Sequence, residues 1–131
     1  MREILFRGKS INDNEWVFGD LIRNLIWDGR EKEMRIGDIY FEHNGDIHGT
    51  AVYKVIPETV GQFTGLTDRN GKKIFEGDIM QLCSACYPCL VYWDGKSWAW
   101  KQNGKRREID LTREKMDIIG NIFDNPELFG E

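Results

Sequence analysis

Short hydrophobic runs alternate with turn-forming polar segments along the whole chain. The runs are rich in aromatic and β-branched residues, and Gly, Asp or Asn follows most of them. This alternation is typical of β-strands joined by tight turns. A short helix over residues 20–27 is the alternative to a strand in that segment. The sequence predicts strands at residues 4–6, 16–18, 21–27, 36–41, 50–56, 60–65, 73–75, 79–82, 90–93, 97–101 and 118–123.

The predicted turns combine Asn or Asp with Gly, and the densest lies at residues 68–71, with the sequence Asp-Arg-Asn-Gly. Asn and Gly tolerate a positive φ, which the tight turns of β-hairpins require. Residues 110–117 are the one fair candidate for an α-helix. Near the end, Asn125 and Pro126 predict a short capping turn over residues 125–129.

Many short strands with frequent turn signals predict a barrel or a sandwich. We expect a mainly β protein with a small SH3-like barrel, an additional N-terminal β-subdomain and at most one short helix. The domains expected are an N-terminal β-hairpin subdomain at residues 1–56 and a C-terminal small β-barrel at residues 57–131.

The length and charge are those of a small soluble protein. A chain of 131 residues suits one domain with a small subdomain, and can bury a core unaided. The formal net charge of −4 argues against a dedicated nucleic-acid binder, although a local patch counts for more than the total. No apolar run has the length of a membrane span, and no secretory signal opens the chain. We therefore expect a cytoplasmic protein with no membrane partner and with reduced cysteines.

Four segments carry a resemblance to a known family: residues 2–8, 15–22, 57–80 and 119–128. They resemble the YopX family of phage and prophage proteins, and together they span nearly the whole chain. The resemblance implies a phage setting inside a bacterial host cell and a small β-rich fold. Because the family is of unknown function, it implies no active site.

The cysteines form two Cys-x-x-Cys steps that share the middle residue: Cys83, Cys86 and Cys89. Three readings stay open, namely inert thiols in a loop, thiolate ligands of a metal, and a redox pair. A structural zinc site needs a fourth ligand, which His43, His48 or a second chain would have to supply. The incomplete ligand set favours inert thiols, and we expect no cofactor.

Catalytic motifs are missing from the sequence. His43 and His48 flank a turn, but no serine, cysteine or carboxylate is placed by sequence to complete a triad. There is no phosphate loop, dinucleotide fingerprint, zinc-protease motif or serine elbow. We expect no enzyme and nominate no catalytic residue. An unrecognised metal-dependent or hydrolytic enzyme is the third hypothesis.

Aromatic and basic residues gather near the C-terminal end of the predicted meander, and the candidates are Trp98, Trp100, Lys101, Lys105, Arg106 and Arg107. Rings on a β-surface can stack on bases while neighbouring cations hold phosphates. The alternative is that the tryptophans fill the core of a small barrel. A weak nucleic-acid-binding barrel is therefore the second hypothesis.

The first hypothesis is a phage or prophage accessory protein that acts as a binding or self-assembly module. Short strands leave uncovered sheet edges, which invite pairing with another chain. We expect the partner to be a second copy, as in a homo-oligomer, or a phage or host protein.

Overall fold

The computed structural model describes residues 3–25, 33–41, 47–102, 105–108 and 116–129. This part of the chain is mainly β, which confirms the predicted fold class. Within it, no helix has the length and apolar character that a membrane span needs. The strands are β1 (Phe6–Lys9), β2 (Trp16–Leu25), β3 (Glu33–Phe41), β4 (Ile47–Lys54), β5 (Gly61–Thr67), β6 (Lys73–Phe75), β7 (Asp78–Gln81), β8 (Cys89–Trp93), β9 (Trp98–Gln102), β10 (Lys105–Glu108) and β11 (Asp117–Asn121). Two short 3-10 helices accompany them, η1 (Pro57–Thr59) and η2 (Pro126–Phe129).

The chain divides into two compact units, Met1–Gln62 and Phe63–Glu131. The sequence predicted a domain boundary after residue 56. That residues 1–56 and 57–131 fold as separate domains stays a prediction. The 3-10 helix η1 was not predicted, and it begins at a proline whose fixed φ suits a helical turn.

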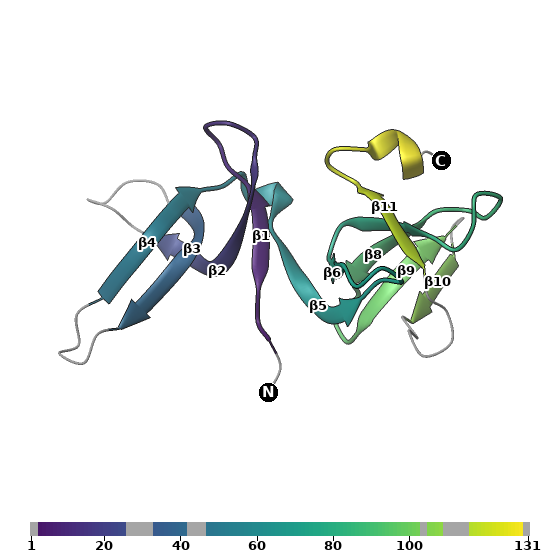
Figure 1. The fold of residues 1–131 in the computed structure, drawn as a ribbon, viewed down its shortest axis with the longest axis horizontal. Coiled ribbons are helices and arrows are strands. Elements are labelled where there is room, and N and C mark those ends of the chain that lie inside the picture. The colour runs from purple at the N-terminus through teal and green to yellow at the C-terminus, as the bar shows by residue number, and fades with distance from the viewer. Residues whose placement is uncertain (1–2, 26–32, 42–46, 103–104, 109–115, 130–131) are drawn as a thin grey trace. The chain divides into compact units, whose positions relative to one another are not determined.

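The first unit is an antiparallel sheet with the strand order β4-β3-β2-β1 (Figure 1). The opening residues of β5 extend it, because Gly61 pairs with Arg7 in β1. Its buried side holds Ile36 and Val55, both almost fully excluded from solvent. Gly8 leaves room for these two side chains, since a Cβ at Gly8 would stand 3.1 Å from Cδ1 of Ile36 and 3.2 Å from Cβ of Val55.

One long strand, β2, replaces the two strands predicted at residues 16–18 and 21–27. The sequence suggested a break at Gly19, but the chain continues through it with a φ of +153°. A Cβ at Gly19 would lie 2.7 Å from the carbonyl oxygen of Gly37 on β3. Glycine therefore lets two backbones approach here and does not end the strand, and the helical alternative is wrong for residues 20–25.

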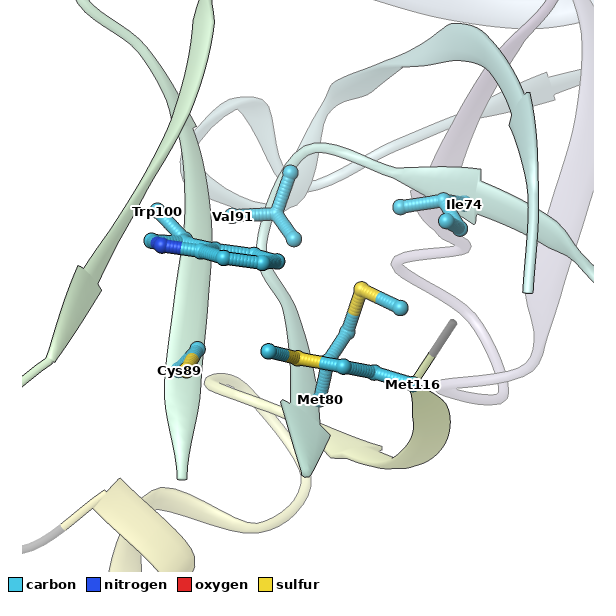
Figure 2. Close-up of a cluster of buried hydrophobic side chains, with 6 residues drawn as sticks. All are labelled: Ile74, Met80, Cys89, Val91, Trp100 and Met116. Atoms are coloured by element: carbon cyan, nitrogen blue, oxygen red, sulfur yellow. The ribbon is translucent and has the colours of Figure 1, made fainter. Parts of the chain in front are cut away.

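The second unit is a five-stranded antiparallel sheet with the order β10-β9-β8-β7-β11, joined by the β5–β6 hairpin. The described strands of this sheet form no closed barrel, so the predicted SH3-like barrel is an open sheet. Figure 2 shows its core, in which side chains from the hairpin and the sheet meet. The buried cluster consists of Ile74, Met80, Cys89, Val91, Trp100 and Met116.

The C-terminal tail packs against β11. Ile122 donates its amide hydrogen to the carbonyl oxygen of Gly77 at 2.9 Å. A Cβ at Gly120 would stand 2.9 Å from Cδ1 of Leu128 in η2, so the tail lies directly on the strand. The predicted capping turn is confirmed, because Leu128 donates to the carbonyl oxygen of Asn125 at 3.0 Å.

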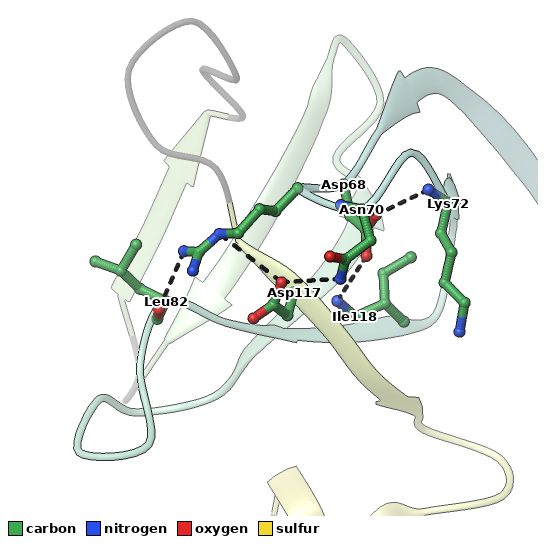
Figure 3. Close-up of polar contacts among 7 residues, drawn as sticks. Asp68, Asn70, Lys72, Leu82, Asp117 and Ile118 are labelled. Atoms are coloured by element: carbon green, nitrogen blue, oxygen red, sulfur yellow. Dashed lines mark hydrogen bonds and ion pairs between the residues drawn. The ribbon is translucent and has the colours of Figure 1, made fainter.

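The predicted turn at residues 68–71 is organised by one buried carboxylate, that of Asp68 (Figure 3). Its Oδ1 accepts the amide hydrogens of Asn70 at 2.9 Å and Lys72 at 2.8 Å. Its Oδ2 accepts the amide hydrogen of Ile118 in β11 at 3.1 Å. Burial raises the pKa of Asp68, but these three hydrogen bonds and the nearby Lys72 charge outweigh it, and the net pKa is lowered.

A second polar contact joins the same turn to two other segments (Figure 3). The Asn70 side chain donates to Oδ1 of Asp117 at 3.1 Å, and Arg69 lies 3.8 Å from the same oxygen. Arg69 also donates to the carbonyl oxygen of Leu82 at 3.3 Å. Asp117, the last residue of the predicted helix, is the first residue of β11, and residues 110–115 lie outside the described residues.

Candidate functional site

The three cysteines have two different environments. Cys83 and Cys86 form a disulfide in the loop after β7, so the expectation of reduced cysteines is wrong for this pair. Cys89 lies in β8, is 1% exposed and belongs to the core cluster of Figure 2. The spacing of the cysteines did not predict this separation. Cys89 points into the core because side chains alternate along β8, whereas Cys83 and Cys86 lie in the loop before that strand.

The cysteines therefore do not form the metal-ligand set that their spacing suggested. Two sulfur atoms are bonded to each other, and the third lies within the hydrophobic core. Neither Cys83 nor Cys86 begins a helix, which is the setting that activates a thiolate in redox enzymes. Across the described ranges no three His, Cys, Asp or Glu side chains gather where a metal ion could bind. His43 and the side chain of His48 lie outside that part of the chain.

The predicted nucleic-acid residues are split between the core and the surface. Trp100 is 2% exposed and packs in the core, which leaves no ring face for a base. Trp98 is half-buried against that core, with its ring centroid 5.1 Å from that of Trp93 in an edge-to-face pair. The prediction that Trp100 belongs to a nucleic-acid site is therefore wrong. Trp100 fills the core instead, which is the alternative that the sequence left open.

One of the predicted cations, Lys101, lies away from those tryptophans, whereas Lys105 is opposite Gln102 in the register of β9 and β10 and so lies on their face. Lys101 follows Trp100 directly on β9, so its side chain points to the opposite face of the sheet. Its Nζ stands 4.4 Å from the centroid of the Tyr92 ring. Lys105 is exposed in β10, and the side chains of Arg106 and Arg107 lie outside the described part of the structure.

A different set of cations and rings shares one face of the N-terminal sheet. In the register of β1 and β2, Arg7 is opposite Phe18 and Lys9 is opposite Trp16. Residues directly opposite one another, or two apart on one strand, point to the same face of a sheet. We call this surface the cation–aromatic face, and its members are Arg7, Lys9, Trp16, Phe18, Arg35 and Lys54.

Two rings and two cations form the centre of this face. The guanidinium carbon of Arg7 stands 4.7 Å from the centroid of the Trp16 ring, and Nζ of Lys9 stands 5.7 Å from it. Both distances lie within the range of cation–π attraction. Phe18 is 52% exposed, although it lies in the middle of a strand. Arg7 itself is buried, with 8% of its surface exposed, so this centre presents to solvent mainly the Phe18 ring and the half-buried Lys9.

The remaining two cations are direct neighbours. Arg35 in β3 is opposite Lys54 in β4 and also opposite Ile22 in β2, which places both cations on the same face as Phe18. Arg35 is half-buried and Lys54 is exposed. One acidic residue, Asp20, lies on the same face between Phe18 and Ile22 on β2, and it is exposed.

Sequence reasoning missed this face although a signal for it was present. Arg7 and Lys9 are separated by one residue, as are Trp16 and Phe18, so each pair points to one side of its strand. The pairing of β1 with β2, which puts the two pairs together, is a property of the fold. Cations and an exposed ring can hold an anionic or flat ligand, but this set contains no paired nucleophile and base.

Comparisons with known proteins agree with the fold. The family model described as YopX protein matches residues 5–130. The crystal structure of protein EF1440 from Enterococcus faecalis is similar, with a TM-score of 0.68 and 21% sequence identity, covering 99% of this chain and 100% of that chain. No curated protein matches the chain. Because the family model spans nearly all of the sequence, the chain belongs to the YopX family.

Proposed function

We propose that the protein is a binding module, with no catalytic role, that holds an anionic partner on the cation–aromatic face. The observation that carries the proposal is the Phe18 ring, which is 52% exposed and directly opposite Arg7 in the sheet. Covering a large apolar side chain is favourable by about 1.5–3 kcal/mol when it becomes fully buried. A partner that covers Phe18 and carries negative charge would gain from both the ring and the cations.

The phage or prophage setting that the family resemblance implies, and a place in the cytoplasm of the bacterial host, are part of the same proposal. In that setting the module would act on a phage or host component and supply no chemistry of its own.

Retention on immobilised heparin, a general polyanion, tests the proposal. We expect the wild-type protein to be retained at low salt, where attraction between charges is least screened. The variant Lys54→Glu should elute at lower salt, because it reverses one charge of the face. The matched control is Lys96→Glu, since Lys96 is an exposed lysine in the turn between β8 and β9. Equal elution of all three proteins would contradict the proposal.

Self-association through a sheet edge is a second candidate function. Among the described strands, β4 pairs only with β3, so one edge of β4 is available to a second copy. Uncovered edges are templates for pairing between chains. Light scattering over a range of protein concentrations should show a rising mass. A strict monomer at the highest concentration would exclude self-association and leave the anion-binding proposal untouched.

A further inference from the structure

The cation–aromatic face also points to the class of partner. We propose that this face binds single-stranded nucleic acid, with bases stacked on the Phe18 and Trp16 rings and phosphates held by the surrounding cations. The inference rests on the proposed function, because it names the anion that the module would hold. It replaces the site predicted around Trp98 and Trp100 with one on the other unit of the chain.

The spacing of the rings suits consecutive bases. Trp16 and Phe18 are two residues apart on β2, which separates them by about 7 Å along the strand. Phe18 is 52% exposed, whereas Trp16 is half-buried with Arg7 and Lys9 over its ring, so the Phe18 ring offers most of the surface that a base could cover. Every base has a flat π face, and stacking on aromatic side chains therefore tolerates different sequences.

The cations lie on both sides of the rings in the sheet. Arg7 and Lys9 come from β1, next to β2, while Arg35 and Lys54 come from β3 and β4 on the other side. A nucleic-acid strand that runs along β2 would have Lys9 on one side and Arg35 and Lys54 on the other. This arrangement concentrates cations locally in a chain whose formal net charge is −4.

The exposed ring distinguishes a single strand from a duplex. The bases of a duplex are stacked on each other and cannot cover Phe18, whereas the bases of a single strand can. A general polyanion such as heparin uses the cations alone. The inference therefore predicts that binding depends on the Phe18 ring as well as on charge.

Fluorescence anisotropy with a labelled oligothymidylate measures the binding. If the three cations that are not buried, Lys9, Arg35 and Lys54, contact phosphates, raising the salt from 50 to 200 mM should weaken binding by about 20-fold, since each contact contributes about 0.7 to the salt slope. Phe18→Ala should weaken binding about 5-fold or more without changing the slope. Lys54→Ala should reduce the slope by about 0.7.

The control for the ring is Tyr53→Ala, because Tyr53 lies next to Lys54 on β4, is 44% exposed and points to the opposite face. Its binding should equal that of the wild-type protein. Should Phe18→Ala unfold, Phe18→Leu keeps an apolar side chain without a ring and should still lose binding, whereas Phe18→Trp should keep it. Thermal melting curves establish that each variant is folded.

Two results would overturn the inference while the proposed function stands. One is equal binding of duplex and single strand with no effect of Phe18→Ala, which would mean that the face holds any polyanion. The other is no oligonucleotide binding at 50 mM salt in a protein whose heparin retention still depends on Lys54. If the wild-type protein binds neither the oligonucleotide nor heparin at low salt, the inference and the proposed function are overturned together.

Discussion

The carboxylate of Asp68 accepts a hydrogen bond from the amide of Ile118, a residue 50 positions further along the chain, at 3.1 Å. The same carboxylate accepts the amide hydrogens of Asn70 and Lys72 within its own turn. One side chain therefore shapes the turn between β5 and β6 and fastens the strand β11 beside it (Figure 3). This double role makes Asp68 a test of how the second unit holds together.

Replacing Asp68 with alanine should lower the free energy of unfolding by about 2–3 kcal/mol, because backbone amides lose a charged acceptor. Urea denaturation measures the change. The matched control is Asp94→Ala, since Asp94 accepts the amide hydrogens of Lys96 and Ser97, both in its own turn. The control should cost about 1 kcal/mol or less. Equal losses in the two variants would contradict the link to β11.

The lowered pKa of Asp68 gives its contribution a defined pH dependence. The carboxylate of the folded protein holds its charge to lower pH than that of the unfolded chain, so its contribution is fully present above the ordinary aspartate pKa. It is lost as the pH falls below about 4 and through the folded-state value. The difference in stability between the wild-type protein and Asp68→Asn should therefore shrink from pH 6 to pH 2. A difference that is constant with pH would show that the charge contributes nothing.

Trp100 and Trp93 should differ sharply in their effect on stability. Trp100 is 2% exposed and Trp93 is 47% exposed. Trp100→Ala opens a cavity in the core and should cost about 3–5 kcal/mol. Trp93→Ala loses mainly its edge-to-face contact with Trp98 and should cost about 1 kcal/mol. Chemical denaturation compares the two, and a similar cost for both would contradict the burial of Trp100.

Gly19 should tolerate no side chain, although it lies inside a strand. In Gly19→Ala the new Cβ would meet the backbone oxygen of Gly37 at 2.7 Å, so β2 or β3 would have to move. We expect a loss of about 3 kcal/mol in the free energy of unfolding. Gly65→Ala is the control, because Gly65 also has a positive φ but no atom lies within 4 Å of its Cβ position. Its cost should be about 1–2 kcal/mol, from backbone strain alone.

The disulfide between Cys83 and Cys86 should contribute little to stability. It closes a very short loop, so its removal frees little chain entropy and should cost about 2 kcal/mol or less. Melting temperatures of the Cys83→Ser/Cys86→Ser variant test this expectation. Alkylation of the folded protein with iodoacetamide, read by mass spectrometry, should label neither residue until a reductant is added. Labelling of both without reductant would contradict the disulfide.

The positions of most strands follow from local sequence. The strand at residues 73–75 and the capping turn at residues 125–129 formed as predicted, because β-branched and aromatic runs, Asn-Gly and Asn-Pro act on the backbone over a few residues. The long strand β2 was missed for a nonlocal reason. Gly19 reads as a strand end in isolation, and its close approach to Gly37 exists only once β3 lies beside it.

The sequence by itself determined that this protein is built of short strands and that it resembles the YopX family. Only the tertiary structure decided which face each side chain occupies: Trp100 went into the core, and Phe18 came to lie opposite Arg7. The physical reason is that alternation along a strand is local, whereas the register between strands depends on which apolar set is buried. The residues of the cation–aromatic face can therefore be identified in the sequence, but their assembly into one surface depends on the register between the strands.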